Sequence, residues 1–398
     1  MIITFVLFIP IIKVNATELN EIKSNNVILY NLNDDSILYE KNSEDKVLIA
    51  SMTKIMTAIV SIEHIDNLDE KLILTNDIFS SLTNDLSFAG FKPNEEITYR
   101  DLLYGALLPS GADATHSLAI FISGSEEEFV KLMNEKAKEI GMINTNFTNT
   151  IGIEDNNNMH YSTVKDVALL LKYSLKNKEF KKIFTTEKYT TSDNLLNFKS
   201  TKLKMSEKNG IDLSFIKGSK TGYTSKAGLC LASIANYNNV NYLLVTAGAD
   251  YKTNKINHFL DAKNIYEYYF TNYGYKKILK KDQVLKKIKT KYKEDVNIIQ
   301  NKNIELYLKN DIKNKDLTYK YKGIKNLQKG IKKGDVIGKY IVSYKENILY
   351  QEKVLSPVTV KFRLTNNQKI LILMLITTII FIATIKLFVE KKRIHYCN

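Results

Sequence analysis

The sequence predicts an α+β protein in which helices flank an antiparallel sheet, followed by a small all-β domain and a C-terminal transmembrane helix. Three observations support this prediction. Segments with helical periodicity surround three consecutive β-prone segments over residues 215–249. After Tyr275, short β-prone runs alternate with turns rich in Lys, Asn and Gly. Residues 370–389 are apolar and long enough to span a membrane.

Residues 1–16 are predicted to be a signal peptide. Residues 2–12 form an apolar run, and Val14-Asn15-Ala16 then offers a small residue for cleavage. The positive charge that usually precedes such a run is missing, because Lys13 follows it. The alternative is an uncleaved anchor, but an apolar run of this length is too short to cross a bilayer core.

Residues 17–275 are predicted to form the main domain. A hydrophobic content of 44% with 25% charged residues is typical of a globular chain and excludes a disordered or fibrous one. Ser125 and Glu128 have capping-box spacing, and Ser162 is predicted to be an N-cap. The expected elements are a hairpin over 27–40, helices over 51–65, 99–108, 113–122, 125–141 and 162–175, strands over 215–223, 228–236 and 241–249, and a helix over 254–274.

Residues 276–365 are predicted to form a separate basic domain rich in β-structure. Between Lys276 and Tyr340 the sequence holds 20 Lys against 7 Asp or Glu. This surplus of positive charge accounts for nearly the whole net charge of +14. A basic patch can bind nucleic acid, but a secreted and tethered chain is not expected to meet any. Anionic lipid or an anionic wall polymer is the expected neighbour. A solvated Lys-rich surface without a specific partner is the alternative.

The apolar stretch 370–389 predicts a single membrane span, and residues 390–398 a cytoplasmic tail. Lys386 interrupts the stretch near its end, where an ammonium can reach the headgroups. The basic residues that follow favour a cytoplasmic C-terminus, which places the rest of the mature chain on the outer face of the membrane. A buried core helix is the alternative. Cys230 and Cys397 would then lie on opposite sides of the membrane, so no disulfide is expected.

The stretch "IKGSKTGY" over 216–223 carries the first chemical signal. A phosphate-binding loop requires glycines where this chain has Ser214 and Ser219, so that interpretation fails. An exposed strand edge explains it better. In an ideal strand Lys220 and Gly222 point to one face and Thr221 to the other, and a glycine lets a ligand approach the backbone.

Three Ser-x-x-Lys pairs place a hydroxyl one helical turn from an amine. If burial lowers the pKa of such a Lys, its neutral amine can take the Ser proton. The pair Ser43/Lys46 lies in a charged turn, and Ser162 is explained more simply as an N-cap. Ser51, paired with Lys54, begins the most apolar of the three segments and is preferred. Spacing alone does not exclude the Ser162/Lys165 pair.

The order of three motifs carries a family resemblance. Ser51-Met52-Thr53-Lys54 is followed by Ser110-Gly111-Ala112 and then by Lys220-Thr221-Gly222. Together with their flanking residues over about 25–271, these motifs resemble the D-alanyl-D-alanine carboxypeptidases, the low-molecular-mass penicillin-binding proteins. The quoted segments are "IASMTKIMTAIV", "ITYRDLLYGALLPSGADA", "MNEKAKEIGMINTNF", "HYSTVKDVALLL" and "SKTGYTSKAGLCLAS". The resemblance implies a β-lactamase-like or penicillin-binding-protein-like α+β fold and removal of a terminal D-Ala from peptidoglycan stem peptides.

The resemblance also implies the catalytic roles. Ser51 would attack the penultimate D-Ala carbonyl, Lys54 would be its general base, and Ser110 would pass the proton to the leaving nitrogen. Lys220 and Thr221 would hold the terminal carboxylate.

The backbone N–H groups of Ser51 and Tyr223 would form the oxyanion hole. Gly222 and Tyr223 would join Lys220 and Thr221 as substrate-binding residues. β-Lactams would trap Ser51 as a slowly hydrolysed acyl-enzyme. No cofactor is implied. By analogy with the family, the basic domain would serve as a pedestal.

One position departs from the family pattern. The second motif usually ends in Asn, whose amide steadies the substrate, but position 112 is Ala and Asp113 is expected to point elsewhere. A catalytically weakened wall-binding protein is therefore the alternative. A β-lactamase is the less favoured enzyme alternative, and a transpeptidase is disfavoured because Ser51 follows so soon after the signal.

The histidines give no competing site. His160 and Asp166 could belong to a His-based triad, but no G-x-S-x-G accompanies them, and His160 is interpreted as structural. His64 and His116 have no Cys or carboxylate at ligand spacing, so no metal site is expected.

Overall fold

The computed structural model describes residues 19–80, 82–154, 159–290, 295–328, 330–360, 364 and 366–395. The predicted signal peptide lies outside these residues. The chain divides into two compact units, Met1–Thr271 and Asn272–Asn398, and each is described by itself.

The first unit is built on a five-stranded antiparallel sheet with the strand order β2-β1-β9-β8-β7. The expected hairpin forms its first edge, with β1 over Asn26–Asn31 and β2 over Ser36–Lys41. The three β-prone segments become β7 (Ile216–Thr224), β8 (Gly228–Tyr237) and β9 (Val240–Ala249). The predicted α+β class is therefore confirmed, and the motif strand β7 lies at the open edge of the sheet.

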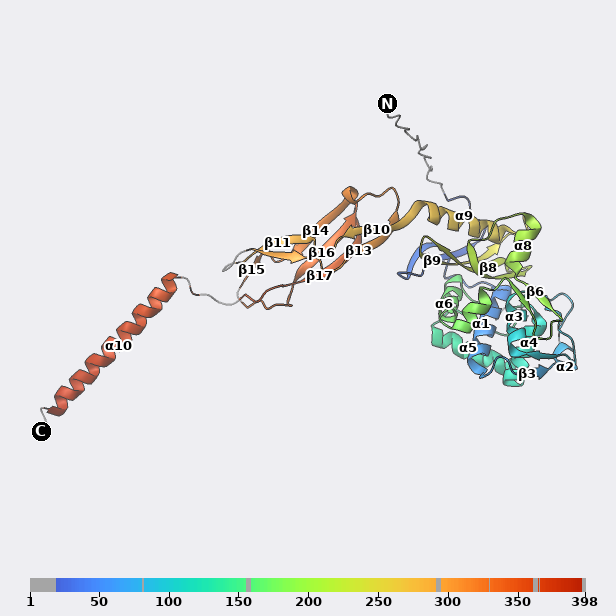
Figure 1. The fold of residues 1–398 in the computed structure, drawn as a ribbon, viewed down its shortest axis with the longest axis horizontal. Helices are drawn as coiled ribbons and strands as arrows, with labels where there is room; N and C mark the ends of the chain where they lie inside the picture. Colours follow the sequence, from blue (N-terminus) through green and yellow to red (C-terminus); the bar gives the residue numbers. More distant parts are fainter. Residues whose placement is uncertain are drawn as a thin grey trace, which may run out of the picture. The chain divides into compact units, whose positions relative to one another are not determined.

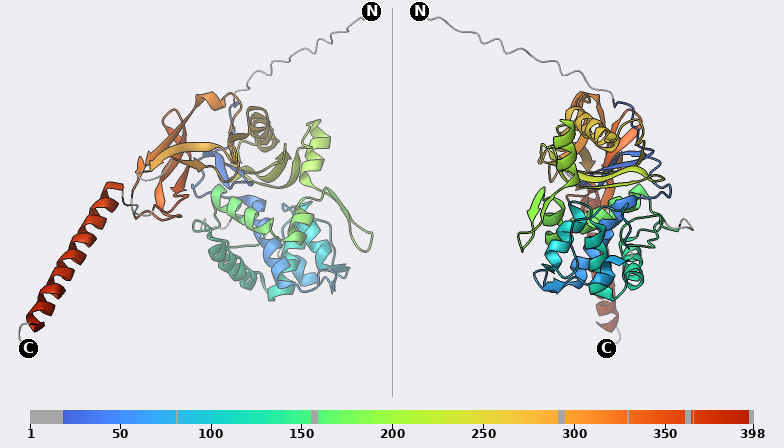
Figure 2. Two further views of the ribbon diagram at one scale, coloured as in Figure 1. Left: turned by 60° about the vertical axis from the view of Figure 1, so that its left-hand side comes forward. Right: turned by 90° about the vertical axis from the view of Figure 1, so that its right-hand side faces the viewer.

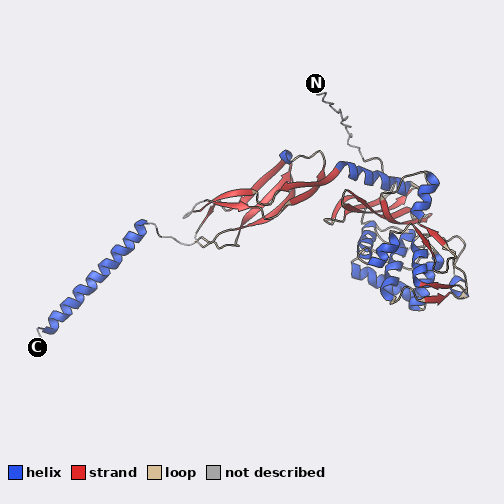
Figure 3. Ribbon diagram, viewed as in Figure 1, coloured by secondary structure: helices blue, strands red, loops and turns tan. Residues whose placement is uncertain are grey.

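Helices cover both faces of this sheet (Figures 1 and 3). On one face lies a bundle in which α6 packs against β1 and β9. On the other face lies α9 (Asn257–Asn272), whose Tyr269 hydroxyl donates to the Leu38 carbonyl at 2.6 Å. The helices of the bundle are α1 (Lys54–His64), α3 (Tyr99–Leu107), α4 (Ala112–Ser123), α5 (Glu126–Ile140), α6 (Val164–Ser174) and α7 (Lys178–Phe184).

The helix α1 is the centre of the bundle. Every residue from Lys54 to Ile62 is buried, and its apolar side chains belong to one continuous core. A helix that is buried on all sides must be enclosed by other elements, and α3, α4, α5 and α6 surround it. The motif residues at its start are thereby fixed in a rigid framework.

One of the two predicted helix N-caps, Ser125, is confirmed, and the other, Ser162, is not. Ser125 accepts the Glu128 N–H at 3.2 Å before α5, and Gly141 ends that helix at φ +89°. The prediction that Ser162 caps the next helix is wrong. The cap of α6 is Thr163, whose Oγ1 accepts the Asp166 N–H at 3.0 Å, while Ser162 Oγ bonds to Thr145.

Several short elements were not expected from the sequence. One of them, a 3-10 turn, leads directly into α1 and is largely buried, and the three-residue strands pair antiparallel with one another. They are η1 (Ala50–Thr53), β3 (Lys71–Ile73), α2 (Asn76–Ser80), β4 (Glu96–Thr98), β5 (Lys188–Thr190), β6 (Asn197–Lys199) and α8 (Thr201–Asn209).

The second unit contains the expected all-β domain, drawn in orange to red in the two views of Figure 2. Its sheets share one apolar core that includes Leu279, Ile288, Leu327 and Val342. Its strands are β10 (Tyr273–Leu279), β11 (Val284–Thr290), β12 (Val296–Ile299), β13 (Ile304–Lys309), β14 (Leu317–Gly323), β15 (Asn326–Leu327), β16 (Val336–Tyr344) and β17 (Asn347–Leu355). The 3-10 turn η2 (Asn314–Asp316) precedes β14.

The chain then continues into one long helix, α10 (Asn366–His395). Within it, Asn366–Val389 is long and apolar enough to cross a membrane and is exposed throughout. This segment contains the predicted span 370–389. Its apolar surface is consistent with a membrane anchor.

Candidate active site

Ser51 lies in the 3-10 turn η1, immediately before α1, and Lys54 is the first residue of that helix. The Lys54 Nζ donates to the Ser51 Oγ at 3.1 Å. The preceding Ala50 has a left-handed backbone at φ +47°, which costs a non-glycine residue about 1–3 kcal/mol. The surrounding core holds this strained turn, so Ser51 is presented in a fixed position.

Lys54 is almost fully buried, with 3% of its surface exposed. Its Nζ also donates to the Ile151 carbonyl at 2.9 Å. Burial lowers the pKa of Lys54 to about 7, and the nearby Asp113 carboxylate opposes that shift. The neutral amine of Lys54 is therefore populated near pH 7 and able to accept the Ser51 proton.

The Ile151 carbonyl is held by a loop with its own supports. Asn149 Oδ1 accepts the Gly152 N–H at 2.7 Å. Glu126 Oε1 accepts both the N–H and the hydroxyl of Thr150, at 2.8 and 2.6 Å. Gly152 has φ +88°, and a Cβ there would meet the turn that carries Ser51, so no other residue can occupy the position without strain.

Ser110 reaches the same site from the loop between α3 and α4. It also has a left-handed backbone, at φ +69°. The Lys220 Nζ donates to the Ser110 Oγ at 2.7 Å and to the Thr221 carbonyl at 2.8 Å. Burial, followed by the charge of Lys54, holds the pKa of Lys220 well below its ordinary value. Lys220 thus lies behind Ser110, with 1% of its surface exposed.

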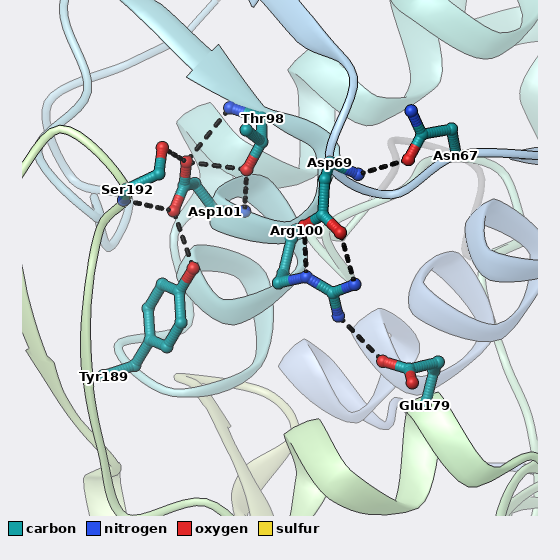
Figure 4. Close-up of polar contacts among 8 residues, drawn as sticks. All are labelled: Asn67, Asp69, Thr98, Arg100, Asp101, Glu179, Tyr189 and Ser192. Atoms are coloured by element: carbon teal, nitrogen blue, oxygen red, sulfur yellow. Dashed lines mark hydrogen bonds and ion pairs between the residues drawn. The ribbon is translucent and has the colours of Figure 1, made fainter.

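The helix α3, which leads to Ser110, is anchored at its start by a buried carboxylate (Figure 4). Asp101 Oδ2 accepts the N–H and the hydroxyl of Thr98, at 3.0 and 2.7 Å, and the Ser192 hydroxyl at 2.7 Å. Asp101 Oδ1 accepts the Tyr189 hydroxyl at 2.8 Å and the Ser192 N–H at 3.0 Å. These bonds tie the start of α3 to the β5–β6 hairpin region.

Beside this anchor, Arg100 joins two acidic side chains. Its Nε donates to Asp69 Oδ1 at 2.6 Å, and its Nη1 donates to Glu179 Oε2 at 2.7 Å (Figure 4). Asp69 also accepts from the second Arg100 nitrogen at 3.1 Å, which makes that pair bidentate. The hydrogen bond to Asp69, as the largest influence, raises the pKa of Arg100. Both clusters lie in the framework of the site.

The strand β7, at the edge of the five-stranded sheet, forms one side of the site. Burial alternates along the strand as expected, with Lys220 and Gly222 facing inward and Tyr223 exposed. A Cβ at Gly222 would lie 2.9 Å from the Ser51 nitrogen, so only glycine lets this strand approach the nucleophile's backbone. Tyr223 stacks on Tyr251 with ring centroids 4.3 Å apart.

Two cavities meet at Ser51. The first, named here the Lys54 cavity, has a volume of about 470 Å³ and is lined by Lys54, Ala112 and Glu154 among others. The second, named the Thr221 cavity, has a volume of about 540 Å³ and is lined by Ser110 and Thr221 among others. The residues that line both are Ser51, Asp85, Ser87 and Tyr223. The residues predicted from the sequence therefore gather at one cleft, and Ser51 lies where the two cavities of this cleft adjoin.

Ala112 is buried in the wall of the Lys54 cavity. Among the described residues that line this cavity, none is Asn or Gln, so no amide there replaces the one that the family pattern leads us to expect. Asp113 points elsewhere, as predicted. Its two oxygens accept the N–H groups of Ala89, Gly90 and Phe91 at 2.8–3.0 Å.

The other candidates lie outside this cleft. Ser43 Oγ donates to Glu40 at 2.9 Å, away from the site. His160 is buried, its Nδ1 accepts the Thr148 N–H at 3.2 Å, and its Nε2 bonds to Thr53 Oγ1 at 2.9 Å, so it supports the motif turn. Burial raises the pKa of Cys230 to about 12.

Acidic, His and Cys side chains do not gather into a metal site in the part of the chain that the structure describes. There, no group of three or more such residues has the arrangement of a metal site. Sequence reasoning missed the Ile151 carbonyl and the residues that hold its loop. No signal could have found that acceptor, since every residue carries a carbonyl.

Comparisons with known proteins match both parts of the chain. Residues 13–251 match the profile of the D-alanyl-D-alanine carboxypeptidases. Residues 273–361 match that of the penicillin-binding protein 5 C-terminal domain.

Individual proteins agree with these matches. The D-alanyl-D-alanine carboxypeptidase DacF of Bacillus subtilis is 31% identical over 83% of this chain and 84% of its own length. A D-alanyl-D-alanine endopeptidase of Escherichia coli is 32% identical over 62% of this chain and 76% of its own. The crystal structure of penicillin binding protein 5 from Haemophilus influenzae has a TM-score of 0.64 at 24% identity, covering 87% of this chain and 100% of that one, and so shows the shared fold.

Proposed function

Because the chain belongs to the D-alanyl-D-alanine carboxypeptidase family of serine hydrolases, we propose that it removes the terminal D-Ala of peptidoglycan stem pentapeptides through an acyl-enzyme on Ser51. One observation carries the proposal. Ser51 and Ser110 share one cleft, and each hydroxyl is held by a buried lysine, with 3.1 Å from Lys54 Nζ to Ser51 Oγ and 2.7 Å from Lys220 Nζ to Ser110 Oγ.

Acylation begins with proton transfer from Ser51 to neutral Lys54. The Ser51 Oγ attacks the carbonyl carbon of the penultimate D-Ala, and the carbonyl oxygen becomes an oxyanion. The N–H groups of Ser51 and Tyr223 are proposed to stabilise that oxyanion. The close approach of β7 to the Ser51 nitrogen at Gly222 supports this pairing, and one such donor is worth about a hundredfold or more in rate.

Collapse of this intermediate breaks the C–N bond. The proton passes from Lys54 through Ser110 to the leaving nitrogen, and D-Ala departs with its amine and its carboxylate. A water molecule then attacks the Ser51 ester, Lys54 accepts a proton from that water, and Ser51 regains its own proton as the shortened peptide leaves.

The terminal carboxylate of the substrate is proposed to bind at Thr221. This residue lines the cavity beside Ser51, whereas the buried Lys220 reaches the cleft through Ser110. A carboxylate bound nearby would favour the charged form of Lys220. The open edge of β7 also leaves backbone groups free to pair with an extended peptide.

β-Lactams are proposed to acylate the same serine. The apolar helix Asn366–Val389 supports a membrane anchor, and we place the catalytic unit on the outer face of the membrane, where peptidoglycan lies. The basic second unit is proposed to face anionic lipid or wall polymer.

The experiment uses purified full-length protein in detergent. Labelled penicillin should modify Ser51, as located by peptide mass spectrometry, and a synthetic pentapeptide should release free D-Ala. Ser51→Ala should abolish both, whereas Ser43→Ala, outside the cleft, should retain both. A modified residue other than Ser51, or no D-Ala release, would contradict the proposal and leave a binding-only role for the chain.

A further inference from the structure

The second unit contains a pocket of its own, with a volume of about 250 Å³. It is named here the Gln300 pocket and is lined by Leu285, Gln300, Glu352 and Pro357 among others. One wall comes from β12 and the residues after it, and another from the end of β17. Both strands are at the edges of their sheets. The pocket therefore belongs to the unit that carries none of the predicted catalytic residues.

Two polar side chains of this pocket have buried atoms without a hydrogen-bond partner among the described residues. These atoms are Nε2 of Gln300, a residue with 2% of its surface exposed, and Oε1 of Glu352. The other oxygen of each side chain is used. Gln300 Oε1 accepts the Asn301 N–H at 3.0 Å, and Glu352 Oε2 accepts the Tyr350 hydroxyl at 2.8 Å. Gln300 also lies close to that hydroxyl, without the geometry of a hydrogen bond from its Nε2.

Such a pair of atoms requires an explanation, because buried polar atoms in folded proteins are nearly always hydrogen-bonded. Gln300 Nε2 is a donor and Glu352 Oε1 is an acceptor, yet no hydrogen bond joins them. The last torsion of a Gln or Glu side chain is broad, so a small rotation turns either atom toward the pocket. A bound group that both donates and accepts would satisfy both atoms at once.

Exposed aliphatic side chains surround the same pocket. Ile299 and Leu355 line it and are about half exposed. Each lies directly opposite another exposed aliphatic residue on the neighbouring strand, Val284 for Ile299 and Val336 for Leu355. Directly opposite residues of an antiparallel pair share one face of the sheet. Clustered exposed apolar side chains of this kind mark binding surfaces.

The charge of the pocket differs from that of the unit around it. The charged side chains among its described lining residues are Glu352 and Lys353, one of each sign. Anionic lipid or an anionic polymer would therefore gain nothing from this pocket, whatever it gains from the lysines elsewhere in the unit. A neutral ligand is favoured.

The buried atoms also limit the shape of the ligand. A secondary amide offers an N–H to the carboxylate and a carbonyl oxygen to the Gln300 amide. Because both atoms lie below the surface, the group that reaches them must be a short side group. A main-chain amide of a peptide continues on both sides and does not meet this requirement. An acetamido group does, and its methyl group can pack on the aliphatic wall.

The size of the pocket agrees with a single sugar ring that carries such a group. A volume of about 250 Å³ is below the usual range for pockets that enclose a drug-sized ligand. The C–H face of a sugar ring can pack on Ile299 and Leu355. Asn297 and Asn301, which also line the pocket, can bind its hydroxyl groups.

We propose that the Gln300 pocket binds an N-acetylated sugar of a glycan chain. Glu352 Oε1 accepts the acetamido N–H, and Gln300 Nε2 donates to the acetamido oxygen. No covalent bond is made or broken. The inference goes beyond the proposed function and does not depend on the carboxypeptidase reaction, because the pocket lies in the second unit. It gives that unit a specific neutral ligand in addition to its basic surface.

The test uses purified full-length protein in a polyoxyethylene detergent, since a glycoside detergent would compete for the pocket. Isothermal titration calorimetry measures the binding of a β-1,4-linked tetramer of N-acetylglucosamine. Two further probes are a β-1,4-linked glucose tetramer, which has hydroxyl groups in place of the acetamido groups, and tetra-L-alanine, which has main-chain amides alone.

Three variants separate the pocket from the rest of the unit. Glu352→Gln keeps the size of the side chain and an oxygen for the Tyr350 hydroxyl, but places N–H groups where the ligand must donate. Leu355→Ser removes an apolar contact at an exposed position, where the fold tolerates the change. The matched control Glu346→Gln removes a carboxylate from an exposed turn of the same unit, outside the pocket.

The N-acetylglucosamine tetramer should bind wild-type protein at least about tenfold more tightly than the glucose tetramer, and tetra-L-alanine should not bind. Glu352→Gln should weaken the binding of the N-acetylglucosamine tetramer at least about tenfold and Leu355→Ser about threefold, whereas Glu346→Gln should match wild type. Salt should change this affinity little, because the ligand is uncharged. All three variants should release D-Ala from the pentapeptide as wild type does.

Four results would overturn the inference: no binding of the N-acetylglucosamine tetramer, equal binding of the glucose tetramer, binding of tetra-L-alanine in its place, or wild-type affinity in both Glu352→Gln and Leu355→Ser. Failure of the wild type to release D-Ala would contradict the proposed function alone. The binding result would then still decide the inference.

Discussion

The rate of D-Ala release should depend on the protonation of Lys54. With a pKa of about 7, this amine is mostly protonated at lower pH and cannot accept the Ser51 proton. We expect kcat/KM for the pentapeptide to fall about tenfold for each pH unit below 7 and to level off above about pH 8. The acid limb should report a single proton.

The same shift has a predictable effect on stability. Lowering the Lys54 pKa from 10.5 to about 7 corresponds to about 5 kcal/mol of destabilisation when the ammonium is charged in the folded protein. Between these two pH values the unfolded chain binds more protons than the folded one, so stability rises with pH through this window. Below pH 7 the full cost is present.

Replacing Lys54 with Met should therefore raise stability while it abolishes D-Ala release. Some of the gain is lost with the hydrogen bonds to Ser51 and Ile151. A remaining gain of about 2 kcal/mol would raise Tm by about 5 °C for a unit of this size. The pH dependence of Tm above pH 7 should also become shallower.

The assays are D-Ala release between about pH 5.5 and 9.5, and calorimetric unfolding over the same range. Lys199→Met serves as the control, since that lysine is exposed and paired at the surface. A flat kcat/KM between pH 6 and 8, or an acid limb near pH 4 to 5, would refute the assignment of Lys54 as the base. A lower Tm for Lys54→Met would refute the stability argument.

Three further predictions concern separate parts of the chain. Gly222→Ala should lower kcat roughly a hundredfold, because its Cβ would lie 2.9 Å from the Ser51 nitrogen and displace the strand; Gly274→Ala, with room for a methyl, should leave kcat unchanged. Burial, the largest influence, raises the pKa of Asp101, but its hydrogen bonds together lower it, so its stabilisation is present at neutral pH and lost in acid. Asp101→Asn should lower the free energy of unfolding at pH 7 by about 2–4 kcal/mol in urea titrations, and the difference from wild type should be smaller near pH 3. Equal stability of the two proteins at pH 7 would contradict a stabilising role for this network. A chain ending at residue 365 should move from the membrane fraction to the soluble fraction and retain D-Ala release, whereas retention in the membrane fraction would contradict an anchor in α10.

The sequence predicted the long elements well because their periodicity spans many residues. The segment 215–223 became β7 at 216–224, and the segment 125–141 became α5 at 126–140. Strands of three residues, such as β3 and β5, are too short for a period and depend on pairing with distant partners. They could not be predicted from local sequence.

The error at Ser162 has a similar origin. Ser162 and Thr163 are adjacent hydroxyl residues, and either can cap a helix. Contact of Ser162 with Thr145, seventeen residues away in sequence, takes its hydroxyl out of the cap position. Such a choice is made by tertiary structure and leaves no trace in the local pattern.

Within the active site, the side chains were predictable and their surroundings were not. The motifs gave Ser51, Lys54 and Ser110 through residue type, order and resemblance. The burial that sets the pKa of Lys54 depends on the packing of α1 against other helices. The place of Lys204 and Lys208 in the wall of the Thr221 cavity was also missed, because nothing in their spacing indicates it.

The meeting of two cavities at Ser51 has a consequence for the order of events. If the proposed acyl-enzyme forms and its leaving group occupies the Thr221 cavity, that group would depart while the acyl chain stays bound to Ser51, which lines both cavities. The vacated space then admits the second reactant to the same face of the ester. Whether that reactant is water or another amine becomes a competition for one entrance. The relative concentrations of water and of competing amines at that entrance would therefore decide between hydrolysis of the ester and transfer of the acyl group to an amine.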